Sequence, residues 1–307
     1  MAFALKPEQP IRRRLKDVVR QQLCLAETSL GDDRTAGVHE ARKSVKKVRA
    51  LVALLQEADA GALGKDARRL RAVGHAIAPL RDADAAISTF DRLRAHFPKR
   101  LPEHTHAMLR RRLVRAMTRA LSEARADRTL ARAAHALHTV RRSAKGWRIP
   151  AIDAHELPNL LKASYRAGRK AMGRAHDRMT PADLHQWRKR VKTLWYHLRL
   201  AEPLAPGLRS DVRRLDQLET RLGEDHNLSM LQVALTKDDD LARRVPGALR
   251  ELSAMSTAVQ AKLRQKTFAL GKRLFADRPK AFARRLRRAI SGNARATARK
   301  TRHRKAA

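Results

Sequence analysis

The chain has 307 residues, of which 69 are Lys or Arg and 30 are Asp or Glu, so its formal net charge is +39. Solubility requires far less charge than this, and a compact chain so strongly charged repels itself unless an anionic partner is present. Aromatic residues make up only 4% of the chain, and its common residues (Ala, Arg, Leu and Lys) are good helix formers, which favours an all-α fold over a strand-rich one.

Breaker and capping residues divide the sequence into helical segments. Thr35, after the turn Gly31-Asp32-Asp33, and Thr180, followed by Pro181 and Asp183, are expected as N-caps. In chain order, we expect helices at about 10–30, 36–58, 63–96 with a kink or break at Pro79, 104–126, 128–145, 158–178, 181–202, 208–235, 247–276 and 279–303.

The longest non-periodic stretch in the middle of the chain, 149–158, marks the expected boundary between two halves. Residues 1–148 are predicted as the N-terminal bundle half, 149–294 as the C-terminal bundle half, and 295–307 as a flexible basic tail. Residues 1–150 hold 33 basic and 15 acidic residues, and residues 151–307 hold 36 and 15. Each half is therefore basic in its own right.

Targeting and redox signals are few. The single cysteine, Cys24, excludes an intramolecular disulfide and a cysteine-based zinc site, and its leucine neighbours favour a buried thiol. The first residues hold no apolar segment of signal-peptide length, and no stretch approaches the roughly 20 apolar residues of a membrane helix. We expect a cytoplasmic protein.

An internal repeat is the most informative feature. Residues 38–55 read VHEARKSVKKVRALVALL, and residues 184–201 read LHQWRKRVKTLWYHLRLA. At an offset of 146, His39, Arg42, Lys43 and Lys46 match His185, Arg188, Lys189 and Lys192. A weaker echo follows at an offset of 145, where IAPLRDAD (77–84) parallels LGEDHNLS (222–229). The two halves are predicted to be duplicated helical bundles.

Each repeated segment predicts a helix with an apolar stripe beside a cationic one. The apolar residues fall at spacings of 3 and 4, and so do the cations, which places each set on one helix face. Like charges at these spacings destabilise a helix by a few tenths of a kcal/mol per pair, so the pattern favours an anionic chain lying along the face. The apolar stripes comprise Val38, Ala41, Val45, Val48, Val52 and Leu55, and Leu184, Trp187, Val191, Leu194 and Leu198. Arg49 continues the first cationic line, and Tyr196 follows the second one turn later.

Other chemistry finds little support in the sequence. A cationic helix face is usually just a face exposed to solvent. This explanation is sufficient for one such helix, but it accounts less well for a pattern that occurs twice. His39 and His185 have no second ligand at metal spacing, so we expect neither a metal nor a cofactor. The carboxylates are scattered, and Asp238-Asp239-Asp240 is typical of a helix start. We expect a protein that is not an enzyme.

The paired HxxRKxxK helices, the turn at Arg81-Asp82 with its counterpart at His226-Asn227, and the late stretch LGKRLFADRPKAFARRL (270–286) resemble the CHAD family, named for conserved histidines in an α-helical domain. The resemblance implies two pseudo-symmetric four-helix bundles with a basic cleft or pore between them, which binds inorganic polyphosphate. It marks as phosphate contacts His39, Arg42, Lys43, Lys46, His185, Arg188, Lys189 and Lys192. Arg81, Asp82 and Asn227 match its turn, with Asp82 orienting neighbouring cations. Arg49, which continues the first cationic line, is expected to contact the polymer as well. Further candidates, which a solvated face explains equally well, are Arg112, Arg115, Arg119, Lys262 and Lys266.

Many relatives in the family carry an attached triphosphate-cleaving domain with alternating glutamates, and the sequence shows none; Glu8 stands alone. Two functions other than polyphosphate binding remain open at this point. Sequence-independent binding of RNA or DNA backbones is the runner-up function, because it uses the same charge. Few aromatic stacking platforms count against it, and the basic run 295–307 counts for it. A scaffold on polyphosphate or other storage granules is compatible with polyphosphate binding.

Overall fold

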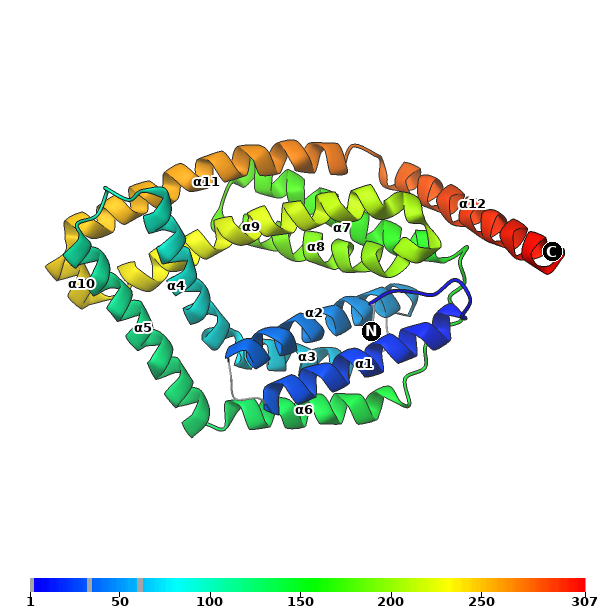
Figure 1. Ribbon diagram of the computed structural model, residues 1–307, viewed down its shortest axis with the longest axis horizontal. Helices are drawn as coiled ribbons and strands as arrows, with labels where there is room; N and C mark the ends of the chain where they lie inside the picture. The colour runs from blue at the N-terminus through cyan, green and yellow to red at the C-terminus, as the bar shows by residue number, and fades with distance from the viewer. Residues whose placement is uncertain (1–2, 32–34, 60–62, 307) are drawn as a thin grey trace.

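The structure is a computed structural model that describes residues 3–31, 35–59 and 63–306, without the side chains of Thr35 and of residues 297–306. The described chain is all-α, as predicted (Figure 1). Its helices are α1 (Ile11–Gly31), α2 (Thr35–Ala58), α3 (Gly64–Ala76), α4 (Ala78–His96), α5 (Glu103–Ala126), α6 (Thr129–Ala144), α7 (Leu157–Arg178), α8 (Pro181–Ala201), α9 (Arg209–Thr236), α10 (Asp239–Arg244), α11 (Pro246–Leu274) and α12 (Pro279–Ala306), with 3-10 turns η1 (Glu202–Leu204) and η2 (Pro206–Leu208).

Helix ends follow the local chemistry of the sequence. The Thr180 hydroxyl accepts a hydrogen bond from the Asp183 backbone N–H at 3.1 Å, which confirms that cap. The break expected at Pro79 occurs at Ile77, because proline is favoured in the first turn of the new helix. Asp238 caps the short α10, which we did not predict as a separate helix. The turn at Asp32-Asp33 and the side chain of Thr35 lie outside the described residues.

The order of the helices repeats along the chain. Helices α1, α2, α5 and α6 correspond to α7, α8, α11 and α12, and the pair α3 and α4 corresponds to the single long α9. At the offset of 145, Pro79 corresponds to Glu224 in the middle of α9. A proline lacks the N–H that an uninterrupted helix needs there, so the first copy is broken and the second is continuous.

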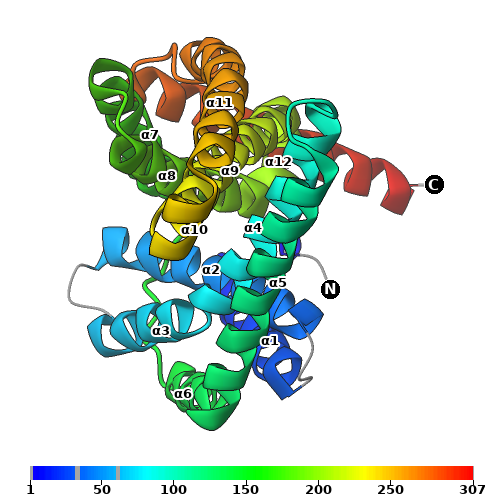
Figure 2. The same cartoon turned by 90° about the vertical axis from the view of Figure 1, so that its left-hand side faces the viewer.

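The helices pack as two lobes connected by long arms. In the first lobe α1 packs on α2 and α6, and α3 packs on α6; in the second, α8 packs on α7 and α9, and α12 on α7. Helices α4 and α5 leave the first lobe and pack on the far halves of α9 and α11, around a core that includes Phe90, Leu109, Leu231 and Leu252. Figure 2 shows these arms crossing from one lobe toward the other. The arrangement is consistent with two related bundles, and the division at 148/149 stays a prediction.

One apolar core extends through both lobes. The ring of His197, on α8, bonds the backbone carbonyl of Ala50, on α2, with 2.7 Å between Nε2 and O. Near this contact, the Leu5 N–H donates to the Leu200 carbonyl at 2.8 Å. The two repeated helices are therefore fixed to each other near their C-terminal ends.

One expectation differs from the structure. The Cys24 thiol is exposed, because Leu23 and Ala26 turn toward the core and positions 24 and 25 lie on the outer face of α1. Helix α12 continues through residues 295–306 (Figure 1), a little beyond the limit of 303 expected for it, and the flexibility expected of 295–307 stays a prediction. After Gly292 this segment contains neither glycine nor proline and is rich in Ala, Arg and Lys, which are good helix formers.

Among the described helices, none has the length and apolar character of a membrane span.

Candidate functional site

The apolar stripes of α2 and α8 are buried as predicted. Every residue of both stripes is at most 3% exposed, and Trp187 and Val191 are completely buried. The adjacent faces carry the repeated cations, because residues one or two positions from a buried stripe lie at its margin. The sequence thus directs the cations of each lobe toward the boundary between the lobes.

Four of these cations form the central cation cluster: Arg42 and Lys46 on α2, and Arg188 and Lys192 on α8. Lys46 is mostly buried, and burial, together with the charges of Arg42, Arg188 and Lys192, lowers its pKa to about 7. Burial and the charge of Arg188 also help to lower the pKa of Arg42. The cationic faces of α2 and α8 therefore lie close enough for their charges to interact across the boundary between the lobes.

Glu219, on α9, is the acidic member of the site. Its carboxylate lies 2.9 Å from Lys192 Nζ and 3.3 Å from Arg188 Nη2, and its side chain is only 11% exposed. Burial alone would raise the pKa of Glu219, but Lys192 and Arg188 outweigh it and lower the pKa. Burial also lowers the pKa of Lys192 despite this ion pair. Lys46 has no hydrogen bond or ion pair of its own among the described residues.

The histidine of α8 lies against a second histidine on α9. The rings of His185 and His226 are 4.2 Å apart between centroids. Burial, followed by the neighbouring ring of His226, lowers the pKa of His185 to about 4, and burial with Arg188 lowers the pKa of His226 to about 4. Both rings are therefore neutral at pH 7. His39 on α2 is exposed, and burial and Arg81 lower its pKa.

Arg188 is packed against the backbone of α9. A Cβ atom at Gly223 would lie 3.3 Å from Arg188 Nη2, so a glycine at this position gives the guanidinium the room that it occupies. Arg188 Nε and His185 Nδ1 are buried, and neither has a hydrogen-bond partner in the described structure. Buried polar atoms normally have partners, so these two are the kind of group that an anion could satisfy.

The turn residues of α4 contact the same site. Arg42 lies 3.9 Å from the Asp82 carboxylate and donates to the Ile77 carbonyl at 3.4 Å. Arg81 pairs with Asp84 at 3.0 Å. Asp82 thus lies near one cation of the site, and its role in orienting this cation stays a prediction. Asn227, at the equivalent place, lies on α9 beside His226.

Several predicted contacts lie at the edge of the site or outside it. Lys43 is half exposed and pairs with Glu40 at 2.8 Å, and Lys189 is exposed. Arg49 turns toward α3, where it meets Arg71 and approaches Gly74.

The candidates on α5 and α11 belong to other surfaces. Arg112 forms an ion pair with Asp238, the N-cap of α10, at 2.5 Å. Arg115, Arg119, Lys262 and Lys266 are exposed, and in the described part of the chain no contact connects them to the central cation cluster. An ordinary solvated face accounts for these four positions.

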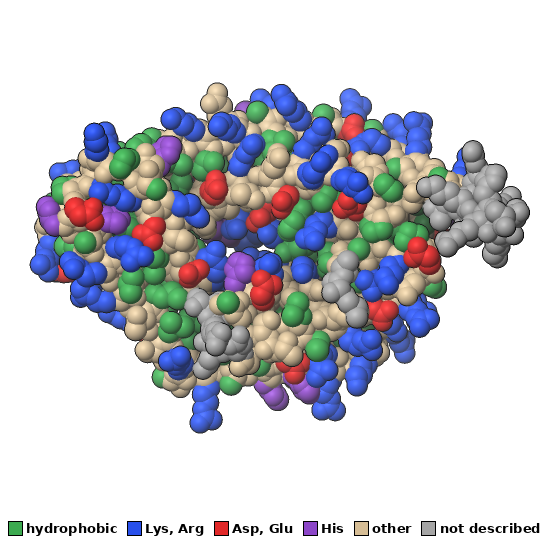
Figure 3. Space-filling model, in the orientation of Figure 1, with side chains coloured by type: hydrophobic (Ala, Val, Ile, Leu, Met, Phe, Trp, Pro, Cys, Tyr) green, Lys and Arg blue, Asp and Glu red, His purple; other side chains and the backbone are tan. Residues whose placement is uncertain are grey.

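A hollow opens between the lobes in the space-filling view, with Lys and Arg side chains around it (Figure 3). Guanidinium and ammonium groups that converge from two sides suit a chain of phosphates, since each phosphate offers several acceptor oxygens. Within the described residues, no group of three His, Cys, Asp or Glu side chains is placed to hold a metal ion.

Sequence reasoning missed Glu219 and the His226 contact with His185. Glu219, Leu222, Gly223 and His226 share one face of α9, at spacings of 3, 1 and 3. An acid and a glycine beside the apolar stripe of Leu215, Leu218 and Leu222 were the available signal. The spacing within α9 does not predict which side chains Glu219 contacts.

Comparisons with known proteins agree with this architecture. The family model of the CHAD domain matches residues 13–236. The crystal structure of the CHAD domain from the plant Ricinus communis is similar, with a TM-score of 0.62 and 19% sequence identity, over 91% of this chain and 96% of that one. At this identity the likeness shows the fold alone. No curated protein sequence matches the chain.

Proposed function

Since the chain belongs to the CHAD domain family, we propose that it binds inorganic polyphosphate, without catalysis, along the central cation cluster. The family is associated with polyphosphate binding. The observation that carries the proposal is the convergence of Arg42 and Lys46 with Arg188 and Lys192 from two repeated helices. Recruitment of the protein to polyphosphate-containing granules follows from the same binding.

The energetics support an anionic ligand at this place. Burying a cation without a partner is costly, and the lowered pKa of Lys46 is the signature of that cost. A phosphate chain would supply the missing negative charge to Lys46 and acceptors to Arg188 Nε. Glu219 forms ion pairs with the α8 side of the cluster, and its charge acts on Lys46 without outweighing the burial and the neighbouring cations that lower the pKa of this lysine. The net charge of the protein would also speed the encounter with a polyanion.

The direct test replaces all four cations of the cluster by glutamine: Arg42, Lys46, Arg188 and Lys192. We expect affinity for long-chain polyphosphate, measured by fluorescence anisotropy at near-physiological salt, to fall on the order of 100-fold. The matched control replaces Arg115, Arg119, Lys262 and Lys266 by glutamine, which removes the same charge from exposed positions, and we expect a small change. An equal loss in both variants would mean that net charge, and not this site, holds the polymer.

Competition separates polyphosphate from the nucleic-acid alternative. We expect excess duplex DNA or tRNA to leave most of the polyphosphate bound to the wild-type protein. Displacement of polyphosphate by either nucleic acid at equal phosphate concentration would overturn the proposed ligand. Circular dichroism of the fourfold variant should show the helical content of the wild type, since these side chains lie at the margin of the core.

A further inference from the structure

Helix α12 sorts its arginines between two faces. Its inner face buries Phe282, Leu286 and Ile290. Arg285 is tied to the second lobe by ion pairs with Asp211 at 2.9 Å and Asp277 at 3.1 Å. The outer face of α12 carries other arginines. The charge of Arg285 is therefore neutralised by ion pairs, whereas the charges of the outer face are exposed.

The exposed arginines form a line, which we name the arginine stripe: Arg284, Arg288 and Arg295. With Ser291 between them, the spacings are 4, 3 and 4 residues, which places all four residues on one helix face. All three arginines are exposed, and none has an ion-pair partner among the described residues. No Asp or Glu follows Asp277 in the sequence, so nothing within the helix neutralises the stripe.

The stripe runs from Arg284 to Arg295, which is about 17 Å at 1.5 Å per residue. The sequence repeats the same spacing at Arg299 and Arg302, whose side chains lie outside the described residues. Asn293 donates to the Pro203 carbonyl at 3.3 Å, and beyond it α12 extends away from the lobes (Figure 1). Helix α12 packs on α7, η1 and η2, whereas the central cation cluster lies on α2 and α8.

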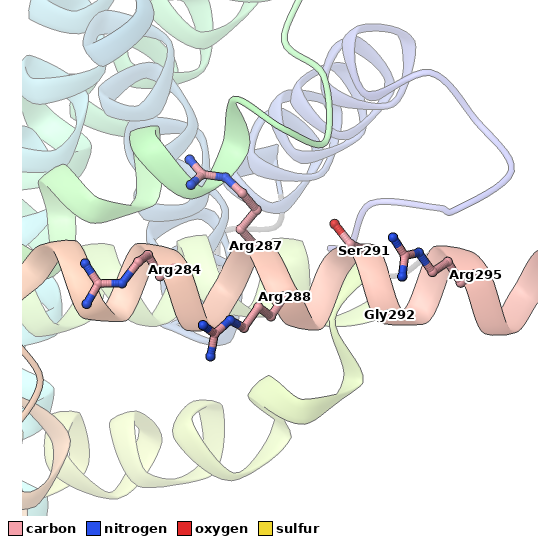
Figure 4. Close-up of a pocket in the computed structure, with 6 residues that line it drawn as sticks. All are labelled: Arg284, Arg287, Arg288, Ser291, Gly292 and Arg295. Atoms are coloured by element: carbon pink, nitrogen blue, oxygen red, sulfur yellow. The ribbon is translucent and has the colours of Figure 1, made fainter.

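A hollow that is open to solvent lies along the stripe. A hollow of about 470 Å³ is lined by Arg284, Arg287, Arg288, Ser291, Gly292 and Arg295. In Figure 4, Arg295 reaches back toward Ser291, and Arg287 and Arg288 leave the helix on opposite sides. Guanidinium groups spread around one helix in this way can donate to phosphates on both sides of it.

The composition of α12 distinguishes between anionic partners. After Ile290 the helix has no large apolar side chain, and a helix that binds a membrane surface inserts such residues. The same lack leaves nothing to anchor an acidic protein, where aromatic and aliphatic side chains supply most of the binding energy. An α-helix about 10–12 Å across fits the roughly 12 Å major groove of B-form DNA, whereas the major groove of an RNA duplex is too narrow.

We propose that the arginine stripe of α12 is a docking surface for the phosphate backbone of duplex DNA, separate from the central cation cluster. Binding is independent of base sequence, because the arginines contact phosphates, which carry no sequence information. Of the amides near the stripe, Asn293 bonds the Pro203 carbonyl and Asn159 accepts from Arg287. The arginine stripe is exposed, so a wide DNA duplex has access to it.

The test replaces Arg284, Arg288 and Arg295 by glutamine and measures the affinity for a short mixed-sequence DNA duplex over a range of salt concentrations. Loss of three phosphate contacts should reduce the slope of log K against log salt by about 3, and affinity at physiological salt by at least about tenfold. The matched control replaces the exposed Arg12, Arg13 and Arg68 by glutamine and should change the slope by less than about one.

Several outcomes would overturn the proposal: an unchanged slope in the stripe variant, an equal loss in the control, or stripe-dependent binding of anionic lipid vesicles without binding of the duplex. An RNA duplex that binds as tightly as DNA would also contradict the groove argument. The fourfold variant of the central cluster should keep its DNA affinity, and the stripe variant should keep its polyphosphate affinity. Failure of one proposal is thereby distinguishable from failure of the other.

Discussion

The cationic faces of α2 and α8 are copies of one pattern, yet their charges are balanced differently. Lys192 and Arg188 on α8 share the buried carboxylate of Glu219. At the offset of 145, Glu219 corresponds to Gly74, so the α2 side has no equivalent acid. Within the residues that the structure describes, Lys46 forms no ion pair, and the one carboxylate near Arg42 is that of Asp82, at 3.9 Å.

The two copies of the pattern therefore share their cations but not the neutralisation of these cations. On α8 the charge is compensated within the protein, and the cost of burial is offset by ion pairing. On α2 the charge is left for a ligand to compensate. Replacing Lys46 or Lys192 by the same residue should therefore change the free energy of unfolding in opposite directions.

The largest expected effect is on folding stability. Lys46→Met should raise the free energy of unfolding by roughly 2–4 kcal/mol, because it removes a buried, unpaired charge. Lys192→Met should lower it by about 2 kcal/mol, because it takes one partner from the buried Glu219. Urea unfolding followed by circular dichroism measures both. Stability changes of the same sign in both variants would contradict the different charge balance of α2 and α8.

The pH dependence of the Lys46 effect has a defined sign. Because the folded-state pKa of about 7 lies below the value of an unfolded lysine, the unfolded chain binds more protons between about pH 7 and pH 10.5. The penalty from Lys46 is full below pH 7 and fades as pH rises through this window. The advantage of Lys46→Met should therefore be greatest at pH 6 and lost near pH 10.

The next effect is on the affinity for polyphosphate. Binding favours protonated Lys46, so above pH 7 the complex must take up a proton, and affinity should fall by up to about tenfold per pH unit. His185 and His226, with pKa values of about 4, do not titrate in this window. Isothermal titration calorimetry in buffers of different ionisation enthalpy counts the proton. Lys46→Arg should bind with little dependence on pH between 7 and 9; a profile as steep as the wild type's would assign the proton to another group.

The smallest effect concerns Glu219. If its carboxylate occupies a position that a phosphate would otherwise take, Glu219→Gln should raise polyphosphate affinity several-fold and steepen the salt dependence by about one contact. Asp216→Asn, which removes an exposed acid of α9, is the control and should change affinity by less than about twofold. Weaker binding by Glu219→Gln would show instead that the carboxylate positions Arg188 and Lys192.

Much of the fold followed from the sequence, because helix periodicity and breakers act locally. The helix limits, the cap at Thr180 and both apolar stripes depend on neighbours within a few residues. The packing of α4 and α5 against the second half, by contrast, depends on contacts between distant segments. The exposure of Cys24 was also missed, since its apolar neighbours do not determine which way the thiol points.

The cations of the site followed from the repeat, whereas their electrostatics did not. Spacing identified Arg42, Lys46, Arg188 and Lys192 as members of two helix faces. It gave no measure of burial, and burial is the main cause of the lowered pKa of Lys46. The pairing of Lys192 with Glu219 joins α8 to α9, which no pattern within one helix predicts.

The contact of Leu5 with Leu200 has a consequence for the time at which the protein folds. The Leu5 N–H donates to the Leu200 carbonyl, and the ring of Phe3 packs edge-on against Tyr196. During synthesis, these early residues must wait until the second lobe has left the ribosome. Closing so long a loop costs entropy that grows only slowly with its length, so the delay is kinetic more than thermodynamic. The last steps of assembly should therefore follow translation.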